Sequence, residues 1–146
     1  MAFWDTSALV KLYVRERDSN RFREIMQTSP SVPIISQLSL AEMHRALWAK
    51  EFAHAIPENR AERTYQVFRA DVATGVIDVI PFGHDVQQEF DRIIPICYRA
   101  GPAILLRSLD GLLLASALIA KLPDLVSTDS RMRAAGPLLG LRVLPN

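Results

Sequence analysis

Cysteine is almost absent from the chain, which contains Cys97 alone. No intrachain disulfide is therefore possible, a reducing compartment is the simpler setting, and Cys97 is expected to be a small buried side chain. A basic leader is also missing, because Met1 runs directly into apolar residues, and we expect no secretory signal. The sequence therefore predicts a cytoplasmic protein.

No hydrophobic run is long enough to cross a membrane. The most apolar stretch, residues 103–122, is interrupted by Arg107, Asp110 and Lys121. Its uncharged part, residues 111–120, would extend about 15 Å as a helix, whereas a bilayer core is about 30 Å thick. We therefore expect a buried core helix here and no membrane partner.

The chain also lacks an excess of either charge and the motifs of several common enzyme classes. Its net charge of +1 neither requires nor excludes a nucleic-acid partner. A glycine-rich phosphate loop is missing. The histidines, His44, His54 and His84, lack the spacing of a zinc site or a catalytic triad, and Cys97 has no base nearby in sequence. These absences argue against zinc-dependent and covalent catalysis.

Length and periodicity predict one α/β domain spanning residues 1–146. The composition, 49% hydrophobic, is sufficient for a core. Short apolar segments alternate with segments of helical spacing, which predicts a parallel sheet covered by helices on both faces. The expected strands are residues 2–4, 32–36, 76–80, 125–127 and 142–144. The expected helices lie near residues 9–13 and at residues 18–27, 39–55, 62–73, 85–100 and 108–122.

Acidic residues follow the predicted strands at the points where helices begin. They are Asp5, Glu42, Asp110 and Asp129. In a parallel α/β sheet such positions face one crevice at the carboxyl ends of the strands. Carboxylates gathered there would repel one another unless a cation lay between them, and all-oxygen ligation suits Mg²⁺ or Mn²⁺. The placement therefore predicts a hard-metal site.

Each acid also has an ordinary structural explanation. Asp5 could cap the first helix, and Asp129 could be a turn acid that pairs with Arg131. Asp110 follows Ser108, the expected helix cap, at a position that favours an acid through the helix dipole. Residues 39–42 read S-x-x-E, a capping box in which Glu42 would bind the backbone at the helix start. Only the whole set favours a metal site over these alternatives.

The segments around the acids resemble the sequence signatures of a known nuclease family. The segments are FWDTSALVKLY, SLAEMHRAL, RSLDGLLLASALIAKL and LVSTDSRM, in this order along the chain. They are similar to the motifs of PIN-domain ribonucleases, especially the VapC toxins of VapBC toxin–antitoxin pairs. The resemblance implies a central parallel sheet of about five strands, with Asp5, Glu42, Asp110 and Asp129 around Mg²⁺ or Mn²⁺.

The resemblance further implies an activity, partners and supporting residues. Ser7 and Ser127 would be supporting polar groups beside the acids. The activity would be hydrolysis of RNA phosphodiester bonds by a metal-activated water, in a metal-dependent endoribonuclease. The protein would be the toxin of a type II toxin–antitoxin system, silenced by a cognate antitoxin.

Three positions depart from the family's pattern. Arg131 stands where some members carry a further acid, so a second metal ion would be weakly held or absent. Leu113 replaces a histidine found in many relatives, and Gly111 replaces a common alanine. Both are expected to leave the chemistry intact, although Gly111 should cost the helix about 1 kcal/mol of propensity.

Basic residues near the acidic motifs are candidates for holding RNA phosphates. These candidates are Lys11, Arg15, Arg45, Arg107 and Arg131. The alternative for each is a solvated or salt-bridged side chain. The denser basic run of Arg60, Arg63 and Arg69 is expected to be a solvated helix face.

Two further expectations concern function class and assembly. The competing class is a catalytically inactive PIN-fold binding or assembly module, against which the intact set of acids argues. A homodimer is expected because the early helices carry more apolar surface than a small sheet requires, with core packing as the alternative. The apolar residues concerned are Phe22, Ile25, Met26, Leu47, Trp48 and Phe52.

Overall fold

The computed structural model describes all 146 residues and contains one sheet of five parallel strands. The strands are β1 (Ala2–Trp4), β2 (Ile34–Ser36), β3 (Asp78–Ile80), β4 (Asp124–Val126) and β5 (Arg142–Leu144). Their order across the sheet is β3-β2-β1-β4-β5, and every neighbouring pair is parallel. The predicted five-stranded parallel sheet is therefore confirmed.

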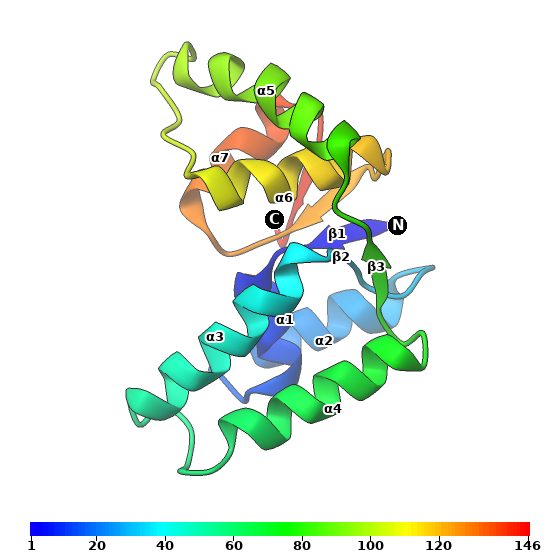
Figure 1. Ribbon diagram of the computed structural model, residues 1–146, viewed down its shortest axis with the longest axis vertical. Helices are drawn as coiled ribbons and strands as arrows, with labels where there is room; N and C mark the ends of the chain where they lie inside the picture. Colours follow the sequence, from blue (N-terminus) through cyan, green and yellow to red (C-terminus); the bar gives the residue numbers. More distant parts are fainter.

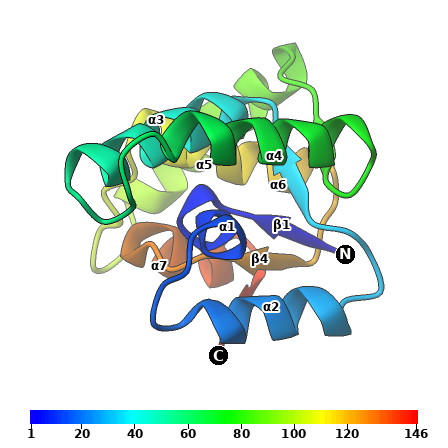
Figure 2. The same cartoon turned by 90° about the horizontal axis from the view of Figure 1, so that it is seen from below.

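Seven helices cover the two faces of the sheet. They are α1 (Thr6–Tyr13), α2 (Ser19–Thr28), α3 (Leu38–Phe52), α4 (Ala61–Ala73), α5 (His84–Tyr98), α6 (Ser108–Ile119) and α7 (Ser130–Leu138). Helices α1 to α4 form one layer, and α5 to α7 form the other, with the sheet between them (Figures 1 and 2). None of the helices combines the length and the hydrophobicity that a bilayer crossing requires.

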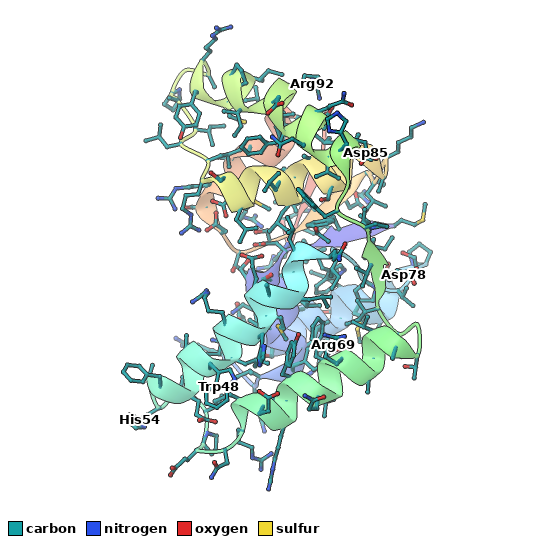
Figure 3. The ribbon with its side chains drawn as sticks, viewed as in Figure 1. Trp48, His54, Arg69, Asp78, Asp85 and Arg92 are labelled. Atoms are coloured by element: carbon teal, nitrogen blue, oxygen red, sulfur yellow. The ribbon has the colours of Figure 1, made fainter.

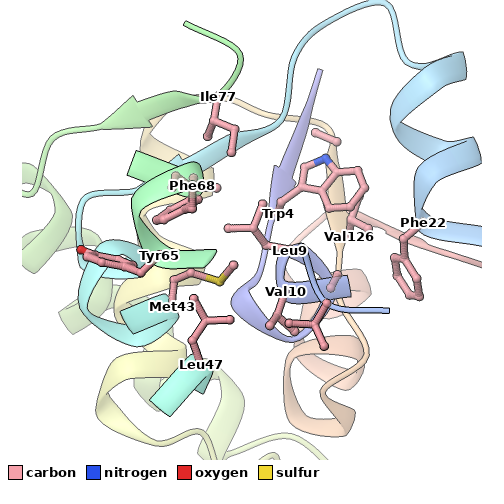
Figure 4. Packing of buried hydrophobic residues seen from close by; sticks show 14 of the residues in the cluster. Trp4, Leu9, Val10, Phe22, Met43, Leu47, Tyr65, Phe68, Ile77 and Val126 are labelled. Carbon is pink, nitrogen blue, oxygen red and sulfur yellow. The ribbon is translucent and has the colours of Figure 1, made fainter. Parts of the chain in front are cut away.

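The core is divided in two by the sheet because side chains alternate along each strand. Trp4 packs among α1 to α4, whereas the preceding Phe3 packs among α5 to α7. In β4, Val126 and Leu125 divide in the same way. Figure 4 shows the first half, in which the fully buried Trp4 lies beside Phe22. Their rings meet edge to face at 6.5 Å.

Helix α7 was not among the helices predicted from the sequence. The Gly136-Pro137 pair is typical of a break, yet both residues lie in the last turns of α7. Gly136 is required there by close packing, since a Cβ atom would lie 2.5 Å from Cγ2 of Val143 in β5. Gly136 thus reflects contact with the sheet, and the helix continues through Pro137 to Leu138.

The strand order places a crevice at the carboxyl end of β1. From β1 the chain builds the sheet towards β2 and β3 on one side and towards β4 and β5 on the other. Loops leaving neighbouring strands in opposite directions open a crevice at such a switch point, where ligands bind in open α/β sheets. The residues that follow β1 and β4 therefore have a special position.

Candidate functional site: an acidic pocket at the switch point

The acids singled out in the sequence line one pocket. A pocket of about 380 Å³ is bordered by Asp5 after β1, Glu42 on α3, Asp110 on α6 and Asp129 after β4. Residues separated by more than a hundred positions are brought together because their elements end or begin at the same edge of the sheet. The structure thus gathers the acids as the junction pattern predicted.

Asp5 is almost fully buried and held by two hydroxyls. Its Oδ2 atom accepts hydrogen bonds from Ser7 Oγ at 2.6 Å and Ser127 Oγ at 2.8 Å. Its side chain makes no capping hydrogen bond to α1, so the simple capping alternative is wrong. Burial raises the pKa of the Asp5 carboxyl, an effect that the hydrogen bonds from Ser7 and Ser127 oppose.

Ser7 and Ser127 also connect the loops that follow β1 and β4. Ser7 Oγ accepts from the backbone N–H of Thr128 at 3.0 Å, and Ser127 Oγ accepts from that of Asp129 at 3.1 Å. Each hydroxyl therefore donates to Asp5 and accepts from the backbone of the loop after β4. These contacts fix the position of the Asp5 carboxylate relative to Asp129.

Glu42 reaches across to α1 and does not close a capping box. Its Oε1 atom accepts a hydrogen bond from Thr6 Oγ1 at 2.8 Å. Helix α3 begins at Leu38, before the expected cap, so Ser39 is already helical, and its buried hydroxyl has no partner. The capping-box alternative for Glu42 is therefore wrong. Burial raises the pKa of Glu42, and the neighbouring charges of Asp5 and Asp110 raise it further.

Asp110 is paired with the residue that caps its own helix. Its Oδ2 atom lies 3.0 Å from Arg107 Nε, and its Oδ1 atom lies 3.4 Å from Arg107 Nη2. The backbone N–H of Arg107 also donates to Oδ2 at 3.3 Å. The N-cap of α6 is thus Arg107, and the prediction of Ser108 as the cap is wrong.

Asp129 uses its two carboxylate oxygens differently. Oδ1 accepts from the backbone N–H groups of Arg131 and Met132 at 2.9 and 3.0 Å, which caps α7. Oδ2 faces Arg107 Nη2 at 3.9 Å. The alternative in which Asp129 pairs with the Arg131 side chain is not found, and Arg131 contacts the acid only through its backbone N–H. Asp129 therefore caps a helix and lines the pocket at the same time.

Comparison with known proteins gives this arrangement a family. The family model for the PIN domain matches residues 2–137 of the chain. The chain belongs to the PIN domain family. PIN domains are typically metal-dependent nucleases and generally use Mg²⁺. None of the curated proteins compared with this PIN domain matches it significantly.

Solved structures of toxins share the fold of this PIN domain. The VapC20 toxin of Mycobacterium tuberculosis, described as cleaving the sarcin-ricin loop, is 17% identical, with a TM-score of 0.67 over 93% of this chain and 95% of that one. A toxin–antitoxin complex from Klebsiella pneumoniae is 17% identical, with a TM-score of 0.66 and coverages of 99% and 96%. FitAcB from Neisseria gonorrhoeae is 15% identical, with a TM-score of 0.69 and coverages of 98% and 96%. At these identities the likeness concerns the fold.

The donors in the pocket of this PIN domain suit a hard divalent cation. All four acids offer carboxylate oxygens, and Mg²⁺ commonly binds one or two carboxylates and keeps several waters. No three acids, histidines or cysteines already stand close enough together to enclose an ion. The carboxylates are instead engaged by Ser7, Ser127, Thr6 and Arg107. Binding a cation here therefore requires water ligands and an adjustment of these contacts.

The predicted RNA-contacting residues divide into two groups. Lys11, Arg45 and Arg107 line the acidic pocket, whereas Arg15 and Arg131 do not. Lys11 is already paired with Glu16 at 2.6 Å. Lys11 also meets Asp18 at 2.7 Å, and Glu16 contacts Lys50 as well. Lys11 is therefore engaged in salt bridges within the protein. Arg45 is the one basic residue of the pocket that forms no salt bridge.

Sequence reasoning missed several residues of the pocket. Thr6, Glu16, Lys50 and Thr128 also line it. Thr6 could have been found, because it directly follows Asp5 in the first motif. Glu16 and Lys50 carried no such signal, since their approach depends on how the loop after α1 folds against α3.

Proposed function

We propose that this PIN domain is a metal-dependent endoribonuclease and the toxin of a type II toxin–antitoxin system. The observation that carries the proposal is the convergence of Asp5, Glu42, Asp110 and Asp129 on one pocket at the switch point of a PIN fold. Resemblance to toxins supports the biological role. Such an enzyme would act on RNA in the cytoplasm.

The four acids would hold Mg²⁺ or Mn²⁺. When bound, such a cation supplies Lewis-acid stabilisation of phosphoryl oxygens and lowers the pKa of a water. Ser7 and Ser127 would favour the ionised form of Asp5 and orient it, because they donate to the same carboxylate oxygen. Thr6 would orient Glu42 in the same way. Arg45 would bind a flanking phosphate, since it lines the pocket without forming a salt bridge.

We further propose that the toxin is a homodimer through an exposed apolar surface at the end of α3. Phe22 and Leu47 belong to the core, so the predicted surface is smaller than expected. Trp48 is 48% exposed and Phe52 is 89% exposed, and a cavity of about 410 Å³ lies beside them. Figure 3 shows Trp48 near the free end of this helix. Large exposed aromatics of this kind are typical of interfaces.

The cognate antitoxin would silence the enzyme through a basic side chain placed among the acids. The pocket already accepts a guanidinium, because Arg107 pairs with Asp110 there. An arginine or lysine from a partner would bind the same carboxylates and compete with the metal ion. Inhibition should therefore weaken when that charge is removed from the antitoxin.

Cleavage of a circular RNA by the purified protein tests the enzymatic proposal. Cutting should require Mn²⁺ or Mg²⁺ and should stop with a chelator, and a circular substrate distinguishes endonucleolytic from exonucleolytic cleavage. Asp78→Asn is the control, because Asp78 is exposed at the start of the edge strand β3 (Figure 3), does not line the pocket and has no side-chain partner. RNA binding without any cleavage would support the inactive binding module instead.

A further inference from the structure

A second cavity borders the same loop after α1 as the acidic pocket. It measures about 280 Å³ and is bordered by the end of α1 and the connection between α3 and α4. The residues that matter to its chemistry are Tyr13, Val14, Arg15, Ile56, Pro57 and Arg60. We propose that this cavity binds a nucleotide of single-stranded RNA a few positions away from the phosphate that lies in the acidic pocket. The inference rests on the proposed function.

The second cavity is lined by positively charged side chains that have no ion-pair partner. Arg15 and Arg60 line it, and no acidic residue does. Neither guanidinium forms a salt bridge or a side-chain hydrogen bond. In the acidic pocket, by contrast, Lys11, Lys50 and Arg107 are each paired with a carboxylate. The two free arginines are therefore available to a ligand phosphate.

The other lining residues of the second cavity are mostly apolar and held in place. Val14 is buried, Ile56 is half-buried, and Pro57 has a fixed backbone. The ring of Tyr13 is held by a hydrogen bond from its hydroxyl to Asp71 at 2.6 Å and by edge-to-face contact with Phe68 at 5.5 Å. A ligand that combines an anionic group with a flat apolar part can use both the arginines and the apolar lining, and a nucleotide has this composition.

The position of the cavity favours RNA over an acidic peptide. Arg15 is adjacent to Glu16, which lines the acidic pocket, so both cavities border the same loop after α1. Helix α3 likewise contributes Lys50 to one cavity and leads directly into Ile56 at the other. A polymer bound in the acidic pocket can therefore continue into the second cavity. An acidic peptide carries no phosphodiester for the acidic pocket, so it would gain nothing from the adjacency of the two cavities.

RNA binding by the cleavage-deficient Asp5→Asn protein tests the proposal. The added changes are Arg15→Gln with Arg60→Gln, and the matched control is Arg99→Gln with Lys121→Gln, which removes equal charge from exposed residues of the opposite layer. RNAs of about 4 and about 12 nucleotides would be compared by fluorescence anisotropy. Thermal unfolding would verify that the variants fold.

The Arg15/Arg60 variant should bind the longer RNA about 10- to 100-fold more weakly, with a salt dependence reduced by about 1.4 in log–log slope. Its affinity for the shorter RNA should be unchanged, and the control should resemble the parent.

Unchanged binding of the longer RNA, or equal losses for both lengths, would overturn this inference while leaving RNA cleavage by the wild type standing. Failure of every form to bind RNA would overturn both proposals. Competition by polyglutamate but not by RNA would assign the cavity to an acidic peptide.

Discussion

The guanidinium of Arg107 lies against the carboxylate of Asp110, with Nε 3.0 Å from one oxygen and Nη2 3.4 Å from the other. The same Nη2 atom is 3.9 Å from Asp129. A cation supplied by the chain thus stands between two of the proposed metal ligands. Because the Arg107 side chain is 65% exposed, it can leave this position without unpacking the core.

Removing Arg107 should strengthen metal binding. In Arg107→Gln a divalent cation no longer competes with the guanidinium for Asp110, so the affinity for Mn²⁺ should rise by roughly 2- to 5-fold, as expected for an exposed ion pair. Isothermal titration calorimetry would measure this. Arg45→Gln is the control, because it removes the same charge from the pocket without breaking an ion pair. Equal gains in the two variants would show that the contact with Asp110 has no particular role.

Glu42→Gln should separate stability from activity. The pKa of Glu42 is raised in the folded protein, so the folded state holds this proton more tightly than the unfolded chain does, where the pKa is near 4.5. Ionised Glu42 therefore destabilises the folded protein. This destabilisation is absent below the unfolded pKa and is fully developed once the pH has risen through the folded pKa. In metal-free protein, the free energy of unfolding of Glu42→Gln relative to that of the wild type should therefore increase from acidic to neutral pH.

Denaturant unfolding across this pH range would measure the difference, and cleavage rates would be measured in parallel. Gln can still accept the hydrogen bond from Thr6, so the fold should be retained while cleavage falls roughly 100-fold or more. Glu24→Gln, an exposed change on α2, provides the control. An advantage that shrinks towards neutral pH, or a fully active Glu42→Gln enzyme, would contradict this account.

Gly111→Ala should destabilise the protein although alanine favours helices. A Cβ atom at Gly111 would lie 2.6 Å from Cε2 of Phe90, where α6 packs against α5. The expected propensity gain should be outweighed by overpacking that costs about 1–3 kcal/mol. Thermal unfolding would measure the loss. Adding Phe90→Leu should recover part of it, and additive losses in the double variant would argue against this contact.

The dimer proposal makes a separate prediction about Phe52. Wild-type protein should be a dimer at micromolar concentration, and Phe52→Ser should weaken association by at least about tenfold, because the side chain is 89% exposed in the isolated chain. Light scattering over a dilution series would measure this. Val67→Ser, also exposed but on α4, is the control. A monomeric wild-type protein would remove the dimer from the account.

The sheet and the gathering of the acids could be predicted from sequence because both follow from local patterns. Alternation of apolar strands with helices determines a parallel sheet, and acids at the junctions then meet at one edge. The helix caps could not be predicted in the same way. Glu42 binds Thr6, 36 positions away, so its contact depends on the tertiary arrangement. Arg107 and Asp110 form a local pair, but their cap lies one residue before the expected Ser108.

The basic residues show the same limit. Lys11 and Arg15 are four positions apart and looked equivalent in sequence, yet the loop after α1 pairs Lys11 with Glu16 and Asp18. Arg15 remains unpaired in a neighbouring cavity, together with Arg60, which sequence reasoning had assigned to a solvated helix face. Such differences arise from loop packing, for which the sequence carries no periodic signal.

The most direct test of the central claim is the single-turnover rate of RNA cleavage at saturating Mn²⁺ in Asp5→Asn and Asp110→Asn, with Asp78→Asn as the control. If the four acids form one metal-dependent site, each pocket variant should fold normally and cleave roughly 100-fold more slowly or not at all, whereas the control should match the wild type. Wild-type rates in folded Asp5→Asn or Asp110→Asn protein would contradict the account.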